Sequence, residues 1–183
     1  NNIMNVLVYL GSNLGDEEYF RDSALEIANW IGNNKYRLIY GGNENGLMGV
    51  LAGRALEKGS EVIGVMPRFL IGMEKPHKDL TEFIEVDTMS ERKDYIRSIS
   101  DICIALPGGP GTMEEITEAI SLYRVKQSDV PCVFYNKNGY YNHMKEMYDL
   151  MLKHGFMTKE ERDSILFTEN VKEIEEFYKR MKK

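Results

Sequence analysis

A glycine-rich run that links an apolar stretch to a helical pattern holds the residues best suited to chemistry. Residues 107–115 read PGGPGTMEE; they follow the apolar stretch 102–106 and precede residues with helical spacing. Glycines let the backbone approach a ligand closely, and the free N–H groups and dipole of a helix N-terminus favour an anion. Glu115 would lie about one turn into that helix. The run therefore predicts a phosphate site with an acid or a base beside it.

The same residues also fit a helix cap that has no further function. Thr112 and Glu115 have the spacing of a capping box, with threonine at the N-cap and glutamate at the third helical position. A capping box accounts for these two residues, but not for the glycines and the proline immediately before them. Both interpretations stay open on this segment alone.

A pair of cations, Arg92 and Lys93, opens the helix that is expected before this run. Adjacent cations at a helix N-terminus oppose the helix dipole, so they are unfavourable unless an anion lies nearby. If both helices face one cleft, Arg92 and Glu115 form a cation and carboxylate pair around the phosphate. The alternative is a solvated pair of cations beside Glu91 and Asp94.

The elements that must position these residues alternate between strands and helices. Apolar segments predict strands at 6–10, 37–40, 61–66, 82–86, 101–106 and 131–135. Helical spacing predicts helices at 17–31, 46–57, 89–98, 112–124, 142–154 and 171–181, whereas 68–80 is expected to be irregular. Strands that are apolar throughout indicate an α/β fold of three layers, in which helices cover both faces of a mostly parallel sheet.

Glycine-rich loops follow three of these strands, at 11–15, 41–46 and 108–111. We expect them at the carboxyl edge of the sheet, where open α/β folds bind ligands. None has the GxGxxG spacing of a dinucleotide site or the Gly-Lys-Ser/Thr of a Walker A loop, and the three histidines lack metal-ligand spacing. NAD, ATP hydrolysis and zinc are therefore unsupported.

Composition restricts the class of protein further. The 183 residues are 43% hydrophobic and 28% charged, so we expect a single globular domain over residues 1–183. A net charge of −6 argues against nucleic-acid or anionic-membrane partners. The chain shows no signal peptide or membrane-spanning run, and Cys103 and Cys132 lie in expected buried strands. We expect a cytoplasmic protein with reduced thiols.

These motifs resemble those of the Lonely Guy (LOG) family of cytokinin-activating phosphoribohydrolases, whose members are often labelled lysine decarboxylases. The resemblance extends from about residue 6 to residue 156. Its most specific part is the PGGxGTxxE pattern of 107–115 together with Arg92, 23 residues before Glu115. It also includes GS at 11–12, YGG at 40–42, GLMG at 46–49, GVMP at 64–67, MxxRK at 89–93, GYY at 139–141 and GF at 155–156.

The resemblance implies a Rossmann-like fold, a homodimer and hydrolysis of the N-glycosidic bond of a nucleoside 5′-monophosphate, without a metal or organic cofactor. The products would be the free base and ribose 5-phosphate. By resemblance Arg92 and Glu115 are the catalytic pair. The substrate-binding residues implied in the same way are Gly11, Ser12, Gly42, Glu74, Met89, Lys93, Gly108, Gly109, Gly111, Thr112 and Ser121. Lysine decarboxylation is unsupported, because nothing marks a Schiff-base lysine with an acidic partner for pyridoxal phosphate.

Two segments depart from the family's pattern. Residues 41–46 read GGNENG, where the family usually has a third glycine and small residues; Glu44 would either repel a second phosphate or point to solvent. Residues 122–128 lack the tryptophan, glutamine, glycine and histidine that cytokinin-type members carry near the base and the dimer interface. An adenine- or cytokinin-type nucleotide is expected, but its base is not specified.

A non-catalytic nucleotide-binding sensor or carrier of the same Rossmann-like superfamily is the alternative function. Both functions would use the glycine run, but only the enzyme needs Arg92 and Glu115 together. Their joint presence favours the enzyme.

Overall fold

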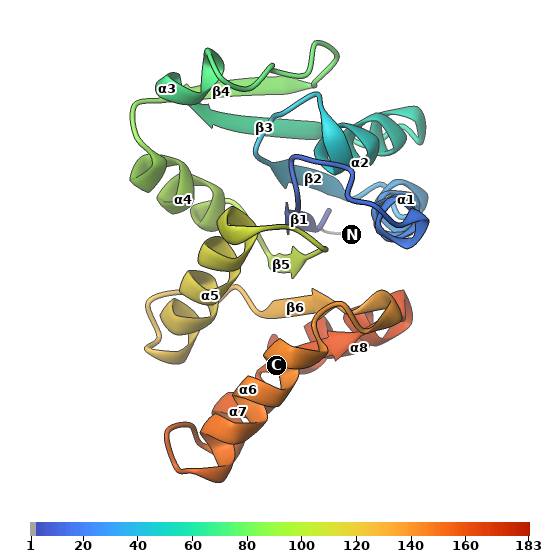
Figure 1. The fold of residues 1–183 in the computed structure, drawn as a ribbon. Coiled ribbons are helices and arrows are strands. Elements are labelled where there is room, and N and C mark those ends of the chain that lie inside the picture. Colours follow the sequence, from blue (N-terminus) through green and yellow to red (C-terminus); the bar gives the residue numbers. More distant parts are fainter. Residues whose placement is uncertain (1–2) are drawn as a thin grey trace.

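The strands of the computed structural model, which describes residues 3–183, join in one seven-stranded parallel sheet (Figure 1). Their order across the sheet is β4-β3-β2-β1-β5-β6-β7. The strands are β1 (Asn5–Tyr9), β2 (Arg37–Tyr40), β3 (Val62–Pro67), β4 (Glu82–Val86), β5 (Ile102–Ala105), β6 (Cys132–Tyr135) and β7 (Ile165–Thr168). Each neighbouring pair is parallel, which confirms the expected α/β class.

Both faces of the sheet are buried, because successive side chains of a strand point in opposite directions. In β1, Val6 and Val8 belong to one apolar cluster, and Leu7 and Tyr9 belong to the other. Helices α1, α2 and α8 pack on the first face, and α4, α5 and α6 pack on the second, so the fold has three layers (Figure 1). The helices are α1 (Glu18–Asn33), α2 (Gly46–Glu57), α3 (Arg68–Ile71), α4 (Met89–Ser98), α5 (Pro110–Arg124), α6 (Asn142–Lys153), α7 (Lys159–Asp163) and α8 (Val171–Met181), with a 3₁₀ turn at Lys137–Gly139.

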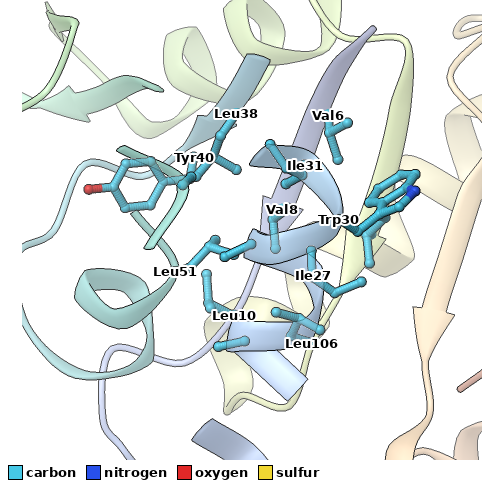
Figure 2. Packing of buried hydrophobic residues seen from close by; sticks show 14 of the residues in the cluster. Val6, Val8, Leu10, Ile27, Trp30, Ile31, Leu38, Tyr40, Leu51 and Leu106 are labelled. Carbon is cyan, nitrogen blue, oxygen red and sulfur yellow. The ribbon is translucent and has the colours of Figure 1, made fainter. Parts of the chain in front are cut away.

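The first cluster anchors α1 over the centre of the sheet. Figure 2 shows Ile27 and Ile31, one turn apart on α1, beside Val8 and Val6 of β1. All four side chains are at most 1% exposed, and complete burial of such a side chain contributes about 1.5–3 kcal/mol. The packing fixes the helix that receives the loop after β1.

The structure differs from the sequence expectations in three places. The short strand β7 was not predicted; it pairs with β6 at the edge of the sheet, after the unpredicted helix α7. The segment 68–80 begins with one helical turn, α3. Helix α5 begins at Pro110 instead of Thr112, which changes the interpretation of the glycine run.

Within residues 3–183, none of the helices has the length and apolar character needed to span a membrane.

The connections of β1 and β5 leave a crevice at the carboxyl edge of the sheet. These strands are neighbours, yet β1 leads into α1 on one face and β5 leads into α5 on the other. Such a switch point is where open α/β sheets bind their ligands.

Candidate active site

A cleft of about 440 Å³ lies at this switch point. Val8 and Tyr9 of β1 contribute to its lining, and the rest comes mainly from the loops that follow β1 and β5 and from α2, α4 and α5. The expected site residues that line it are Gly11, Ser12, Glu74, Met89, Arg92, Gly108, Gly109, Gly111, Thr112 and Glu115. Three glycines of the run, a cation and two carboxylates are thus brought together.

The glycine run does not form the capping box that its sequence allows. Gly109 is the N-cap of α5 and Pro110 is its first residue, so Thr112 lies at the third helical position. Proline suits the first position because its fixed φ matches the helix and no N–H is lost there. The helix start therefore has no side-chain cap. The N–H groups of its first turn have no partner within the helix and are available to an anion.

Close packing of two loops explains why the run needs glycine at position 108. A Cβ on Gly108 would lie 2.2 Å from Thr112 Oγ1 and 2.9 Å from the Gly11 nitrogen. The Gly11 N–H donates to the carbonyl of Pro107 at 3.1 Å, which joins the loop after β1 to the loop after β5. Any side chain at position 108 would separate these loops.

Two tyrosine hydroxyls form hydrogen bonds with the main chain in the glycine run and immediately before it. Neither tyrosine was expected as a site residue. The Tyr140 hydroxyl donates to the carbonyl of Gly108 at 2.6 Å, and the Tyr141 hydroxyl donates to that of Leu106 at 2.5 Å. Tyr140 also lines the cleft and meets Phe20 edge-to-face, with 5.5 Å between ring centroids. The signal in the sequence was the GYY motif at 139–141, whose hydroxyls reach back across the sheet edge.

Arg92 is a buried cation with an incomplete set of partners. Its side chain extends from α4, and Nη2 lies 3.6 Å from Oε2 of Glu115. The residue is only 7% exposed, and its Nε and Nη1 have no hydrogen-bond partner. Gly41 lies against it, and a Cβ there would meet Met48 Cε at 2.6 Å and Arg92 Nη1 at 3.4 Å. A buried donor without a partner is costly, so these N–H groups indicate a ligand that accepts from them.

Glu74 adds a second carboxylate to the cleft. Its Oε2 is buried and has no hydrogen-bond partner. Burial raises the pKa of this carboxyl, and the guanidinium of Arg92 opposes the rise. Glu74 and Arg92 both line the cleft, and each has buried polar atoms without a partner, which suits a ligand group that both donates and accepts.

Burial raises the pKa of Glu115 to about 7, although Arg92 lowers it. The carboxyl is therefore near half-ionised at neutral pH, where it can take up or release a proton. A pKa close to the working pH is what general acid–base catalysis requires.

Three expected residues do not line the cleft. Gly42 is buried beside β3, where a Cβ would lie 3.5 Å from Gly64 Cα. Lys93 pairs with Glu114 at 2.7 Å and with Glu118 at 2.9 Å, and Ser121 is exposed on α5. Their roles toward a substrate stay predictions.

The solvated-pair alternative is wrong for both cations: Arg92 is buried in the cleft, and Lys93, whose side chain is largely buried, pairs with Glu114 and Glu118 of α5. Glu44 does not line the cleft, and its carboxylate pairs with Lys75 at 3.1 Å. It therefore neither faces a bound phosphate nor points freely to solvent. Across residues 3–183, histidine, cysteine and acidic side chains do not gather in threes as a metal site would need.

Comparison with known proteins gives a consistent result. A family model described as "Possible lysine decarboxylase" matches residues 48–177. The cytokinin riboside 5′-monophosphate phosphoribohydrolase LOG5 of Arabidopsis thaliana is 36% identical over 169 residues, which cover 92% of this chain and 74% of that protein. LOG3 of the same plant is 33% identical over the same share of the chain and 79% of its own length.

Solved structures with the same fold include carriers of the molybdenum cofactor. The Moco carrier protein of Chlamydomonas reinhardtii has a TM-score of 0.72 with 20% identity, covering 98% of both chains. The molybdenum cofactor binding protein of Rippkaea orientalis has a TM-score of 0.67 with 16% identity, covering 99% of this chain and 97% of its own. At these identities the similarity is one of fold.

The raised pKa of Glu115 predicts that this residue destabilises the fold at alkaline pH. Because the folded pKa of about 7 exceeds the ordinary value of 4.5, folding takes up a proton between these values, and stability falls as pH rises through this window. Glutamine resembles the protonated form, so Glu115→Gln should stabilise the protein by about 1–3 kcal/mol at pH 8.5 and by nearly nothing at pH 4.5. Urea unfolding at the two pH values measures the difference.

Glu118→Gln is the matched control. Glu118 carries a lowered pKa, because its ion pairs with Lys93 and Arg97 outweigh its burial. Glu118→Gln removes these ion pairs and should therefore destabilise the protein at pH 8.5. A Glu115→Gln variant that is also less stable at pH 8.5 would contradict the assignment of Glu115 as a buried carboxylate whose ionised form destabilises the fold.

Proposed function

The chain belongs to the family described as possible lysine decarboxylases, which includes the cytokinin riboside 5′-monophosphate phosphoribohydrolases, and from this membership we propose that it hydrolyses the N-glycosidic bond of a nucleoside 5′-monophosphate. The base and ribose 5-phosphate are the products. The observation that carries the proposal is the buried pair of Arg92 and Glu115 beside the uncapped start of α5.

The 5′-phosphate binds at the start of α5. The N–H groups of Gly111 and Thr112 belong to the first helical turn, and the helix dipole favours a dianion there. Arg92 is a poorer place for the phosphate, because the carboxylates of Glu115 and Glu74 share its surroundings. The glycine run therefore carries the phosphate and leaves Arg92 free for the sugar.

The ribose hydroxyls match the unpartnered atoms around Arg92. A hydroxyl accepts one hydrogen bond while it donates another. It can therefore accept from Nε or Nη1 of Arg92 and donate to Oε2 of Glu74, the atoms that have no partner in the cleft. This arrangement places C1′ of the sugar near Glu115.

Glu115 acts on the water and on the developing charge. Cleavage of the glycosidic bond leaves positive charge on the ribose, which a carboxylate stabilises. A water molecule adds its oxygen to C1′ and gives a proton to Glu115, while the electron pair of the broken C1′–N bond remains with the base. Glu115 then passes that proton to the base, directly or through solvent, and returns to its ionised form. The atoms of one water molecule are thereby divided between the two products.

The carrier alternative has less support. The molybdenum cofactor carriers share the fold at 20% identity or less, and a carrier has no use for a carboxyl that titrates near neutral pH beside a buried guanidinium.

We propose in addition that the protein acts as a cytoplasmic homodimer. Exposed apolar side chains of α6, such as Met147 and Leu150, are consistent with a partner surface.

The first test incubates the protein with adenosine, guanosine, cytidine, uridine and prenylated adenosine 5′-monophosphates and measures the free base by chromatography. We expect release from at least one nucleotide and a loss of about 10²–10⁴-fold in kcat for Glu115→Gln, because a positioned acid or base contributes that factor. Glu114→Gln, whose carboxylate faces Lys93 instead of the cleft, is the matched control and should stay active. Binding without release from any nucleotide would support the carrier.

The pH dependence follows from the role of Glu115 as the group that accepts a proton. Only the ionised form is active, so kcat/KM should fall about tenfold per pH unit below pH 7 and reach a plateau above it. In Arg92→Gln the lost cation no longer lowers the pKa of Glu115, so the acidic limb should shift to higher pH. An alkaline limb at pH 7 in place of the acidic one would assign Glu115 as the acid.

The sugar assignment predicts a preference for ribose over 2′-deoxyribose. A hydroxyl bonded to charged Arg92 and Glu74 contributes about 1.5–3 kcal/mol, so kcat/KM for AMP should exceed that for dAMP by about tenfold or more. Glu74→Ala should reduce this preference, since it removes one of the two partners. Equal losses on AMP and dAMP in that variant would place Glu74 away from the 2′-hydroxyl.

A further inference from the structure

The segment 68–80 supplies Leu70 and Glu74 to the cleft, yet none of its side chains is buried. Helix α3 at its start has no buried residue, and Met73 is 79% exposed. Leu80, at the far end of the segment, is half-buried against the first apolar cluster, but no fully buried side chain lies near Glu74 within the segment. Polar contacts therefore contribute to holding Glu74 in place.

Main-chain hydrogen bonds tie the segment to the loop that follows β2. The N–H of Glu44 donates to the carbonyl of Lys75 at 2.8 Å, and the N–H of His77 donates to the carbonyl of Gly42 at 2.9 Å. An isolated antiparallel bridge lies between these two bonds. Glu74 directly precedes the first residue held in this way.

The loop after β2 is itself firmly anchored. The hydroxyl of Tyr40, a fully buried residue, donates to the carbonyl of Asn43 at 3.1 Å. Asn43 is buried, and its Oδ1 accepts from the N–H of Asn45 at 2.9 Å. The core thus fixes the loop after β2, and the segment 68–80 is joined to this fixed loop.

Glu44 adds a side-chain contact to the main-chain ones. Its Oε2 lies 3.1 Å from Nζ of Lys75, and its side chain is 22% exposed, against 71% for Lys75. The hydrogen bond from Lys75 holds the pKa of Glu44 below its usual range, and Lys78 and His77 act in the same direction. One carboxylate on the anchored loop therefore lies near three basic side chains of the segment 68–80.

We propose that Glu44 is a positioning residue, whose ion pair with Lys75 holds the segment 68–80 in the place that directs Glu74 into the cleft. It acts through Glu74 and does not itself touch the substrate. The inference rests on the proposed function, since the consequence of the position of Glu74 is read on a nucleotide. It assigns a role to the residue at which this chain departs from the small residues expected in the loop.

Charge reversal tests the ion pair. Glu44→Lys places a fourth basic group among Lys75, His77 and Lys78, so kcat/KM for AMP should fall about tenfold, mainly through KM, because small displacements of a binding group are costly. Lys75→Glu should have a similar effect. The double variant Glu44→Lys, Lys75→Glu restores opposite charges and should recover to within about threefold of the wild type.

Two controls separate positioning from general destabilisation. Glu61→Lys breaks an ion pair with Arg37 at the amino end of β2, 2.7 Å long and partly exposed, and should leave kcat/KM within about twofold. If Glu44 acts through Glu74, then Glu44→Lys should change kcat/KM by less than about twofold in a Glu74→Gln background, because the two effects are not additive.

Hydrogen exchange gives a readout that does not depend on activity. Glu44→Lys should speed amide exchange over residues 72–77 by about tenfold or more without changing exchange in β1 or β5. Unchanged exchange together with wild-type kcat/KM in Glu44→Lys would overturn the proposal, as would a charge swap that restores neither. If the wild-type protein releases no base from any nucleotide, the proposed function fails, and the exchange experiment still decides whether Glu44 holds the segment.

Discussion

The site depends on a guanidinium that is buried without a full set of partners. Removing a charge from water costs several kcal/mol unless other groups compensate. Arg92 has one carboxylate at 3.6 Å, a second carboxyl in the same cleft and two nitrogens with no acceptor. The pKa of Glu115 stays raised even beside this cation, so burial outweighs the pair's attraction. Both groups are thus less stable than they would be in water, and a polar substrate relieves both.

Such a pair keeps its geometry only if the two helices that carry it are held together. Lys93, the neighbour of Arg92 on α4, pairs with Glu114, the neighbour of Glu115 on α5. Glu118, one turn further along α5, pairs with both Lys93 and Arg97 of α4. These ion pairs join α4 to α5 next to Arg92 and Glu115, and Glu118 alone makes two of the three. Residues that do not line the cleft thus help to hold its two sides together.

Regular elements could be predicted from the sequence because their signals are local. The apolar runs and helical spacing placed six of the strands and the layers around them, and the glycine run correctly marked the carboxyl edge of β5. The start of α5 was misplaced because two local rules compete there: Thr112 and Glu115 fit a capping box, but Pro110 suits the first helical position and the helix begins there. Strand β7 carries the apolar run 165–167 and is as long as β2, β5 and β6, so a local signal was present there that was not predicted as a strand.

The partners in contacts between distant segments could not be predicted from local patterns, even where a motif such as GYY at 139–141 marked one of them. Tyr140 reaches Gly108 across 32 residues, and the contact between Glu44 and Lys75 joins two loops that the sequence could only describe as irregular or divergent.

The structure also limits the part that residues 122–128 can play. Thr112 and Arg124 lie at opposite ends of α5, about 18 Å apart at 1.5 Å per residue. Residues 123, 124 and 126–128 border a separate hollow that the C-terminal lysines and the end of α4 also line. Within one chain, residues 123, 124 and 126–128 thus lie away from the cleft, and a direct effect on a ligand there would require a second copy to bring them to it.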